Sequence, residues 1–136
     1  MATFSKQFLS SSAGIFYGLP IGIMGSASFP AADQFGTKIH TIPSGSTEID
    51  EIWLYATNVS SAGRKVAVQF GNIGSTYEFI QEIPAQSGLT LLIPGLVAGK
   101  TGSASDERTI AAYVDGSSYS NDVLITGYVN RISGST

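Results

Sequence analysis

Apolar and polar side chains alternate along most of the chain after residue 38, which is the pattern of β-strands. The stretches with this period are EIDEIWLYATN, RKVAVQF, TYEFIQEI, LTLLIP, RTIAAYVD and VLITGYVNRI. Segments such as NVSSAG and DGSSYSND separate them and are typical of turns and loops. The pattern predicts an all-β fold of about six to eight short strands, an antiparallel sandwich or jelly roll whose two sheets cover each other's apolar faces.

Proline marks the ends of several of these runs. The Ile-Pro steps are Ile42-Pro43, Ile83-Pro84 and Ile93-Pro94. Proline keeps the preceding residue extended and has no N–H for a neighbouring strand, so each step is expected to end a strand.

Residues 1–37 have a different character, with many large apolar side chains and frequent glycine and proline in FLSSSAGIFYGLPIGIMGSASFPAAD. We expect an extended N-terminal arm, followed by the sandwich domain at 38–136. Two placements are open: the arm forms an edge strand on its own sandwich, or it is buried against other subunits. The second is preferred, and its expected interface residues are Phe4, Phe8, Phe16, Tyr17, Ile21, Ile23 and Met24.

The same segment imitates a signal peptide, because Lys6 precedes an apolar stretch. Gly14, Gly18 and Pro20 would break the helix that such a peptide forms, so neither a signal peptide nor a membrane association is expected. No run approaches the ~20 apolar residues of a membrane-spanning helix.

Composition narrows the classes of function. Only 12% of the residues are charged, the net charge is -3, and there is no cysteine. The seven Lys and Arg residues are scattered, which argues against nucleic acid as a partner. The absence of cysteine excludes disulfides, so the compartment in which the chain folds can be reducing.

Motifs for catalysis or cofactors are weak. PGLVAGKTG has one residue too few between Gly95 and Gly99 for a phosphate-binding loop. His40 is the only histidine and is expected to be structural rather than a triad or zinc residue. Asp115 and Asp122 lack the spacing of a calcium loop, and the sequon at Asn58 is interpreted as a turn. No catalytic residue, metal or cofactor is therefore expected.

Several motifs from residue 38 to 132 resemble a group of small proteins encoded by tailed bacteriophages and their marine and environmental relatives. These motifs are Ile39-His40-Thr41, DEIWLYA at 50–56, IPAQSG at 83–88, IPGL at 93–96 and GYVNRI at 127–132. The resemblance implies a virion structural protein. The long N-terminal arm and the segment 97–122 depart from the group, so both could adapt the protein to its own attachment site.

Small sandwich proteins of this kind often bind outside the capsid shell, commonly as trimers at local threefold positions. The resemblance therefore implies a head decoration, or cement, protein on the outer capsid surface, with the major capsid protein as partner and no enzymatic activity. A second hypothesis is a fibre-associated module that binds host glycans by stacking Trp53, Tyr113 and Tyr119 on sugar rings. A third is a glycan hydrolase, which would need two carboxyl groups about 5–10 Å apart in a cleft.

Overall fold

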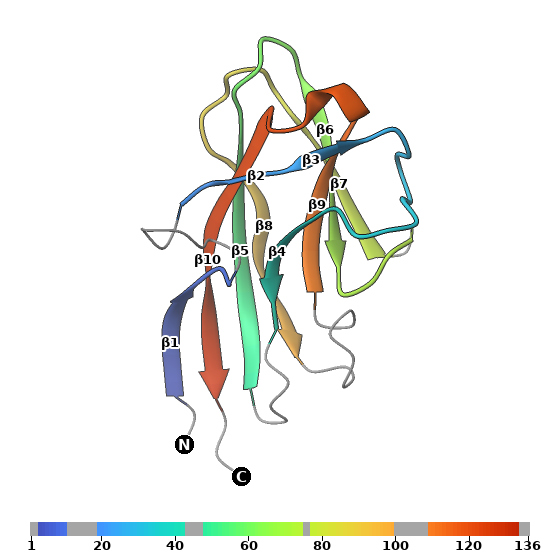
Figure 1. Ribbon diagram of the computed structural model, residues 1–136. Coiled ribbons are helices and arrows are strands. Elements are labelled where there is room, and N and C mark those ends of the chain that lie inside the picture. Colours follow the sequence, from blue (N-terminus) through green and yellow to red (C-terminus); the bar gives the residue numbers. More distant parts are fainter. Residues whose placement is uncertain (1–2, 11–18, 43–47, 75–76, 100–108, 134–136) are drawn as a thin grey trace.

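The computed structural model describes residues 3–10, 19–42, 48–74, 77–99 and 109–133. These residues form two packed sheets, which confirms the all-β sandwich (Figure 1). Sheet A has the order β1 (Thr3–Phe8), β10 (Val123–Ser133), β5 (Glu48–Asn58) and β8 (Thr90–Gly99), and β2 (Ile21–Gly22) also pairs with β10. Sheet B has the order β3 (Met24–Ser26), β9 (Thr109–Asp115), β6 (Arg64–Phe70) and β7 (Glu78–Ile83), and β4 (Thr37–Thr41) also pairs with β9.

The core lies between the sheets and follows the predicted alternation. Ile52, Leu54 and Ala56 of β5 are fully buried, whereas Trp53 and Tyr55 are only partly buried on the outer face. Strands β6, β9 and β10 fill the core in the same way, with Val66, Val68, Ile110, Ala112, Val114, Val123, Ile125 and Val129. The described strands pair antiparallel except β3, which runs parallel to β9.

One proline does not end its strand. Strand β7 stops at Ile83 as predicted, and β4 ends at Thr41, one residue before Ile42. Strand β8 instead continues through Pro94 to Gly99, so the prediction is wrong there. Strand β8 is at the edge of sheet A and its register with β5 shifts beside Pro94, and an edge strand with such an irregularity tolerates the missing N–H.

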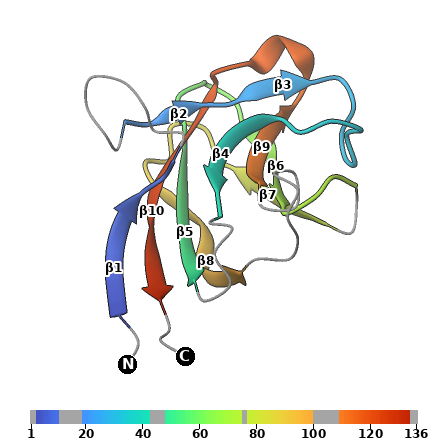
Figure 2. The same ribbon diagram turned by 60° about the horizontal axis from the view of Figure 1, so that its bottom comes forward.

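The described part of residues 1–37 is integrated into the sandwich, which corrects the expected division into an arm and a separate domain. Strand β1 pairs with β10 along its whole length. Residues 21–26, which we call the strap, pair first with β10 of sheet A and then with β9 of sheet B. The strap thus crosses from one sheet to the other and closes that side of the sandwich (Figure 2).

Glycine allows the strap to lie close to the chain beneath it. A Cβ atom on Gly25 would be 2.0 Å from the backbone oxygen of Gly116, which leaves no space for a side chain. The Gly25 N–H donates to Ser120 Oγ at 2.9 Å, and the Gly116 N–H donates to Ser26 O at 2.8 Å. The mixture of glycine and large apolar residues in this segment therefore suits a strap that covers its own core.

The outer face of sheet B is covered by the loop that joins β3 to β4. Phe29 packs edge-on against Tyr113 with a centroid distance of 5.4 Å, and Ala32 and Ala67 complete this small cluster. The Tyr113 hydroxyl donates to Glu78 Oε2 at 2.7 Å and accepts from the Ala32 N–H at 3.1 Å. Burial, together with Glu78, raises the pKa of Tyr113 to about 12. Tyr113 is thus a neutral hydrogen-bonding group that anchors the loop.

We expect Tyr113→Phe to lower the free energy of unfolding by about 1–3 kcal/mol, because it leaves the Ala32 N–H without its acceptor. Tyr55→Phe makes the same chemical change on the outer face of β5 and should change the free energy of unfolding by less than about 0.5 kcal/mol. Urea unfolding of both variants measures the difference. Equal losses would show that the Tyr113 hydroxyl does not anchor the loop.

Candidate functional site

The two sides of the sandwich are covered differently. The strap and the end of β1 close one side, whereas β7 and β8, the last strands of the two sheets, border the other. This second border, which we call the open side, carries large apolar side chains with exposed fractions between 37% and 65%: Tyr77, Phe79, Ile80, Leu89, Leu91, Leu96 and Val97. An exposed apolar surface of this kind marks an interaction site.

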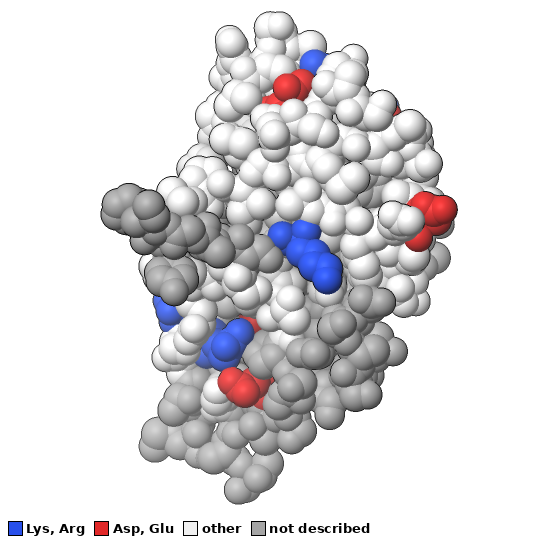
Figure 3. Space-filling model, viewed as in Figure 1, with Lys and Arg blue, Asp and Glu red and all other residues white. Residues whose placement is uncertain are grey.

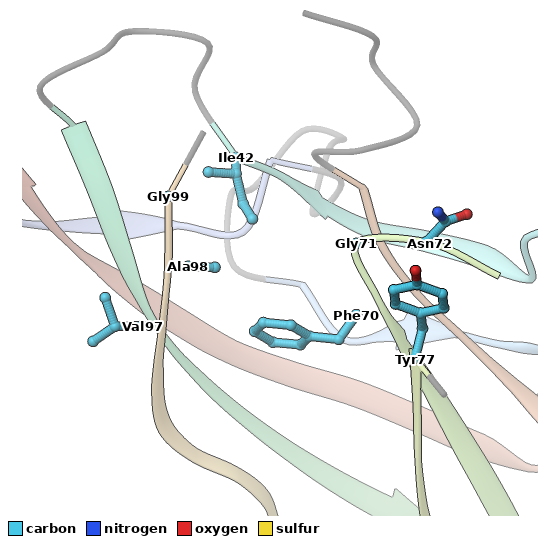
Figure 4. A pocket seen from close by; sticks show the side chains of 8 residues that line it. All are labelled: Ile42, Phe70, Gly71, Asn72, Tyr77, Val97, Ala98 and Gly99. Atoms are coloured by element: carbon cyan, nitrogen blue, oxygen red, sulfur yellow. The ribbon is translucent and has the colours of Figure 1, made fainter. Parts of the chain in front are cut away.

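A groove of about 490 Å³ lies at one end of the open side (Figure 4). Phe70 and Ala98 face each other across it, and Ile42 lies nearby. Tyr77 and Asn72 line the wall formed by the β6–β7 connection. The Phe70 ring also packs edge-on against Phe79, with centroids 5.7 Å apart. The groove therefore opens onto the edge of the hydrophobic core and could accept an apolar side chain.

The expected interface residues of the N-terminal segment have separate positions. Phe4 and Phe8 are 72% and 59% exposed on β1. Ile23 is completely buried in the core, so its expected interface role is wrong: the strap turns it inward. Ile21 is partly buried against the same core, and Met24 is exposed. Phe16 and Tyr17 lie outside the described residues.

His40 belongs to a buried polar network between the sheets. The Ser10 N–H donates to His40 Nδ1 at 3.1 Å, and His40 Nε2 lies 2.7 Å from Asp50 Oδ2. Arg131 binds the same carboxylate with Nε at 2.9 Å and Nη2 at 3.1 Å. This network connects the end of β1 with β4, β5 and β10.

The geometry does not form a serine triad. Because a backbone N–H occupies Nδ1, the hydrogen of the neutral imidazole lies on Nε2 and is donated to Asp50. The Ser10 hydroxyl instead accepts a hydrogen bond from the Thr41 N–H at 2.7 Å. The imidazole therefore has no lone pair directed at a serine oxygen, and His40 has the structural geometry expected from the sequence.

Asp50 is ionised although it is completely buried. Burial alone would raise its pKa, but the hydrogen bonds from His40 and Arg131 and the charge of Arg131 together hold the pKa below the ordinary value of an aspartate. A buried carboxylate that is fully hydrogen-bonded stabilises one arrangement of the surrounding strands. The network thus fixes the relative position of the two sheets at the closed side.

Asp122 and Asn58, from the other candidate motifs, make contacts that stabilise the fold. Asp122 pairs with Arg64 at 3.0 Å, and the described residues contain no group of three or more His, Cys, Asp or Glu that could hold a metal ion. Asn58 is buried and its side-chain amide donates to Ala62 O and Ile83 O, so it organises the predicted turn. Gly95 and Gly99 lie in β8, while Lys100 and Thr101 are outside the described residues.

The three aromatic residues expected to stack on sugars do not lie together. Tyr113 is completely buried, so it cannot contact a glycan, and this expectation is wrong. Tyr119 has the Arg64 guanidinium over its ring at 3.7 Å. Trp53 lies on the outer face of β5 and stacks with Tyr128 of β10, which was not among the expected residues.

The open side could not be predicted from the sequence, because its apolar residues follow the same strand pattern as residues of the core. Phe79, Ile80 and Val97 belong to strands, and strand residues are buried or exposed according to where the strand lies in the sheet. The available signal is weak: EFIQEI has two consecutive large apolar residues, and one of them must face outward in a strand. Strand order, which makes β7 and β8 edges, is not encoded in local periodicity.

The face of the molecule drawn in Figure 3 carries little charge. In Figure 3, acidic and basic side chains form a few separated spots on the face shown, and most of that face is neutral.

Within the described part of the chain, no helix is long and apolar enough to cross a membrane. No protein-family model, curated protein or solved structure matches the chain.

Proposed function

We propose that this protein is a head decoration protein of a tailed bacteriophage, which binds the outer surface of the capsid and stabilises it by bridging copies of the major capsid protein. The bacterial cytoplasm is its proposed site of assembly, and trimers at local threefold positions are its proposed form, as the sequence resemblance implies. The observation that carries the proposal is the open side of the sandwich.

The open side supports docking on a protein shell because its apolar residues are concentrated on one border. Closing the opposite border with the strap buries Ile23 completely, while no described segment covers Phe79 or Val97 in the same way. The free backbone edges of β7 and β8 can also accept an added strand. A partner that covers both edges would bury apolar area and strand hydrogen-bonding groups together.

The glycan hydrolase alternative receives less support from the geometry. An enzyme requires converging reactive groups, and the buried Asp50 carboxylate is already hydrogen-bonded to His40 and Arg131.

The exposed Phe4 and Phe8 on β1 offer a second apolar surface, away from β8 within sheet A. A protein with apolar surfaces at two borders can contact two neighbouring capsid subunits, which is what reinforcement of a shell requires.

Val97→Asp is expected to weaken binding to the capsid at least thirtyfold, because it places a charge in a desolvated contact. Val59→Asp is the matched control: Val59 and Val97 are both 55% exposed, but Val59 lies in the turn after β5. The measurement is co-sedimentation of each variant with capsids of the encoding phage that lack this protein. Thermal unfolding of the unbound variants checks that both remain folded.

Unchanged binding of Val97→Asp would overturn docking through the open side. Phe4→Asp and Phe8→Asp, tested in the same assay, separate a contribution of β1 from that of the open side. If the wild-type protein fails to bind such capsids, or if the gene does not belong to a phage genome, the proposed function is wrong.

A further inference from the structure

An aromatic platform lies on the outer face of sheet A, between β1 and β8. Trp53 and Tyr128 are directly paired across β5 and β10, with ring centroids 6.2 Å apart and an interplanar angle of 15°. A Cβ atom on Gly95 of β8 would be 2.7 to 3.3 Å from three carbons of the Trp53 ring, so the indole lies over the glycine backbone. One face of the indole is thus supported by β8, and the Trp53 side chain is partly exposed beside the nearly parallel Tyr128 ring.

Polar groups at the edge of the platform are fixed in position. Glu51 Oε1 accepts from Trp53 Nε1 at 2.6 Å and from Asn130 Nδ2 at 2.9 Å. The hydrogen bond from Trp53, followed by that from Asn130, lowers the pKa of Glu51, so its carboxylate is ionised at neutral pH. Among the described residues, Glu51 Oε2 has no hydrogen-bond donor and is available as an acceptor.

A hollow of about 400 Å³ adjoins the platform on the β1 side and is lined by Lys6, Gln7, Phe8, Gly127 and Tyr128. The Lys6 ammonium lies 4.6 Å from the centroid of the Tyr128 ring. Lys6 covers this face of the ring, but it is an exposed, flexible side chain that can move aside for a ligand from solvent. The hollow has the size of a small-ligand site and combines aromatic walls with an amine and an amide.

We propose that this platform binds a pyranose sugar, with the apolar C–H face of the sugar on Trp53 and its hydroxyl groups on Glu51 Oε2 and the neighbouring amides. The C–H groups carry partial positive charge and are attracted to the negative face of an aromatic ring. Sugar hydroxyls donate well to an ionised carboxylate. A second sugar unit would fill the hollow beside Tyr128, where Lys6 and Gln7 supply donors.

The chemistry favours a sugar over other occupants. Nucleic acid would need several cations around the stacked rings, and the platform offers one lysine beside one carboxylate. A protein partner would favour protruding apolar side chains at the centre of the contact, whereas here flat rings are bordered by Glu51 and Asn130. Although Gly95 of β8 lies beneath Trp53, the site does not depend on the proposed docking, because its binding groups come from β1, β5 and β10 and its test uses the protein without capsid.

The single tryptophan of the chain, Trp53, makes the test direct. The probes are the methyl glycosides of glucose, galactose, mannose and N-acetylglucosamine, together with glucuronic acid, titrated against the full-length protein. We expect at least one probe to give a saturable change in tryptophan fluorescence, with a dissociation constant on the order of 1 mM.

Three variants complete the experiment. Tyr128→Ala and Glu51→Gln should each weaken sugar binding about tenfold, because they remove a stacking surface and a charged acceptor. Tyr77→Ala removes a 44%-exposed tyrosine of the open side and should leave sugar binding unchanged. The proposal is overturned if no probe gives saturation with the wild-type protein, or if Tyr128→Ala and Glu51→Gln both bind with wild-type affinity.

Discussion

Replacing Asp50 with alanine is expected to lower the free energy of unfolding by about 3–4 kcal/mol. The substitution removes the acceptor of the His40 Nε2–H and of two Arg131 donors at the interior of the sandwich. Removal of one partner of a buried ion pair is costly because the remaining charge keeps its desolvation penalty. Arg131 is 24% exposed and can recover some hydration, which places the expected loss toward the lower end of the range for such pairs.

Chemical unfolding at neutral pH measures this loss, and Asp115→Ala is its control, since Asp115 is an exposed carboxylate at the end of β9. The control should lie within about 0.5 kcal/mol of the wild-type protein. The lowered pKa of Asp50 adds a second readout: its stabilising contribution is present at neutral pH and is lost in acid, as the pH falls from the ordinary pKa of an aspartate through the lowered pKa of the folded state. The difference between wild type and Asp50→Ala should therefore shrink in acid, and a constant difference would contradict the role assigned to the ionised carboxylate.

The strands could be predicted from the sequence because alternation with a period of two is a local property. Alternation predicted which side chains of β5 and β10 point into the core, including Val123, Ile125 and Val129 of β10. The structural role of His40 was also predictable, since a single histidine on a predicted strand, with no nucleophile motif and no cysteine in the chain, offers little for catalysis or metal binding. What local patterns do not contain is which strands become neighbours.

The unpredicted features depend on contacts between residues far apart in sequence. The strap is held by Gly25 and Ser120, which are 95 positions apart, and the covering loop is held by Ala32 and Tyr113, 81 positions apart. The glycines and apolar residues of the N-terminal segment indicated an extended chain with a surface to cover, but that surface is largely the protein's own core. The aromatic platform was half predicted, because Trp53 was identified whereas Tyr128 became its partner only through strand register.

Gly25→Ala is expected to lower the free energy of unfolding by about 2–3 kcal/mol, because its new methyl group would meet backbone rather than a flexible side chain. The three closest atoms, Gly116 O at 2.0 Å, Gly116 C at 3.1 Å and Ser120 N at 3.3 Å, are all backbone and cannot move without displacing the turn after β9. Gly63→Ala is the matched control: the nearest atom to its added Cβ is Glu82 Oε1 at 3.2 Å, at the end of a flexible side chain. The control should be neutral or slightly stabilising, because alanine restricts the unfolded chain more than glycine does.

Hydrogen exchange can establish that the Gly25→Ala effect is local to the strap. The Asn121 N–H donates to Ile23 O at 2.9 Å and the Gly116 N–H donates to Ser26 O at 2.8 Å, so both amides should lose protection when the strap lifts. Amides of β5, between β10 and β8, should retain protection that reflects global unfolding. Equal loss of protection in β5 and at Gly116 would mean that the strap and the core unfold as one unit. A selective loss would show that a sandwich closed on one side by its N-terminal segment can open there while its sheets persist.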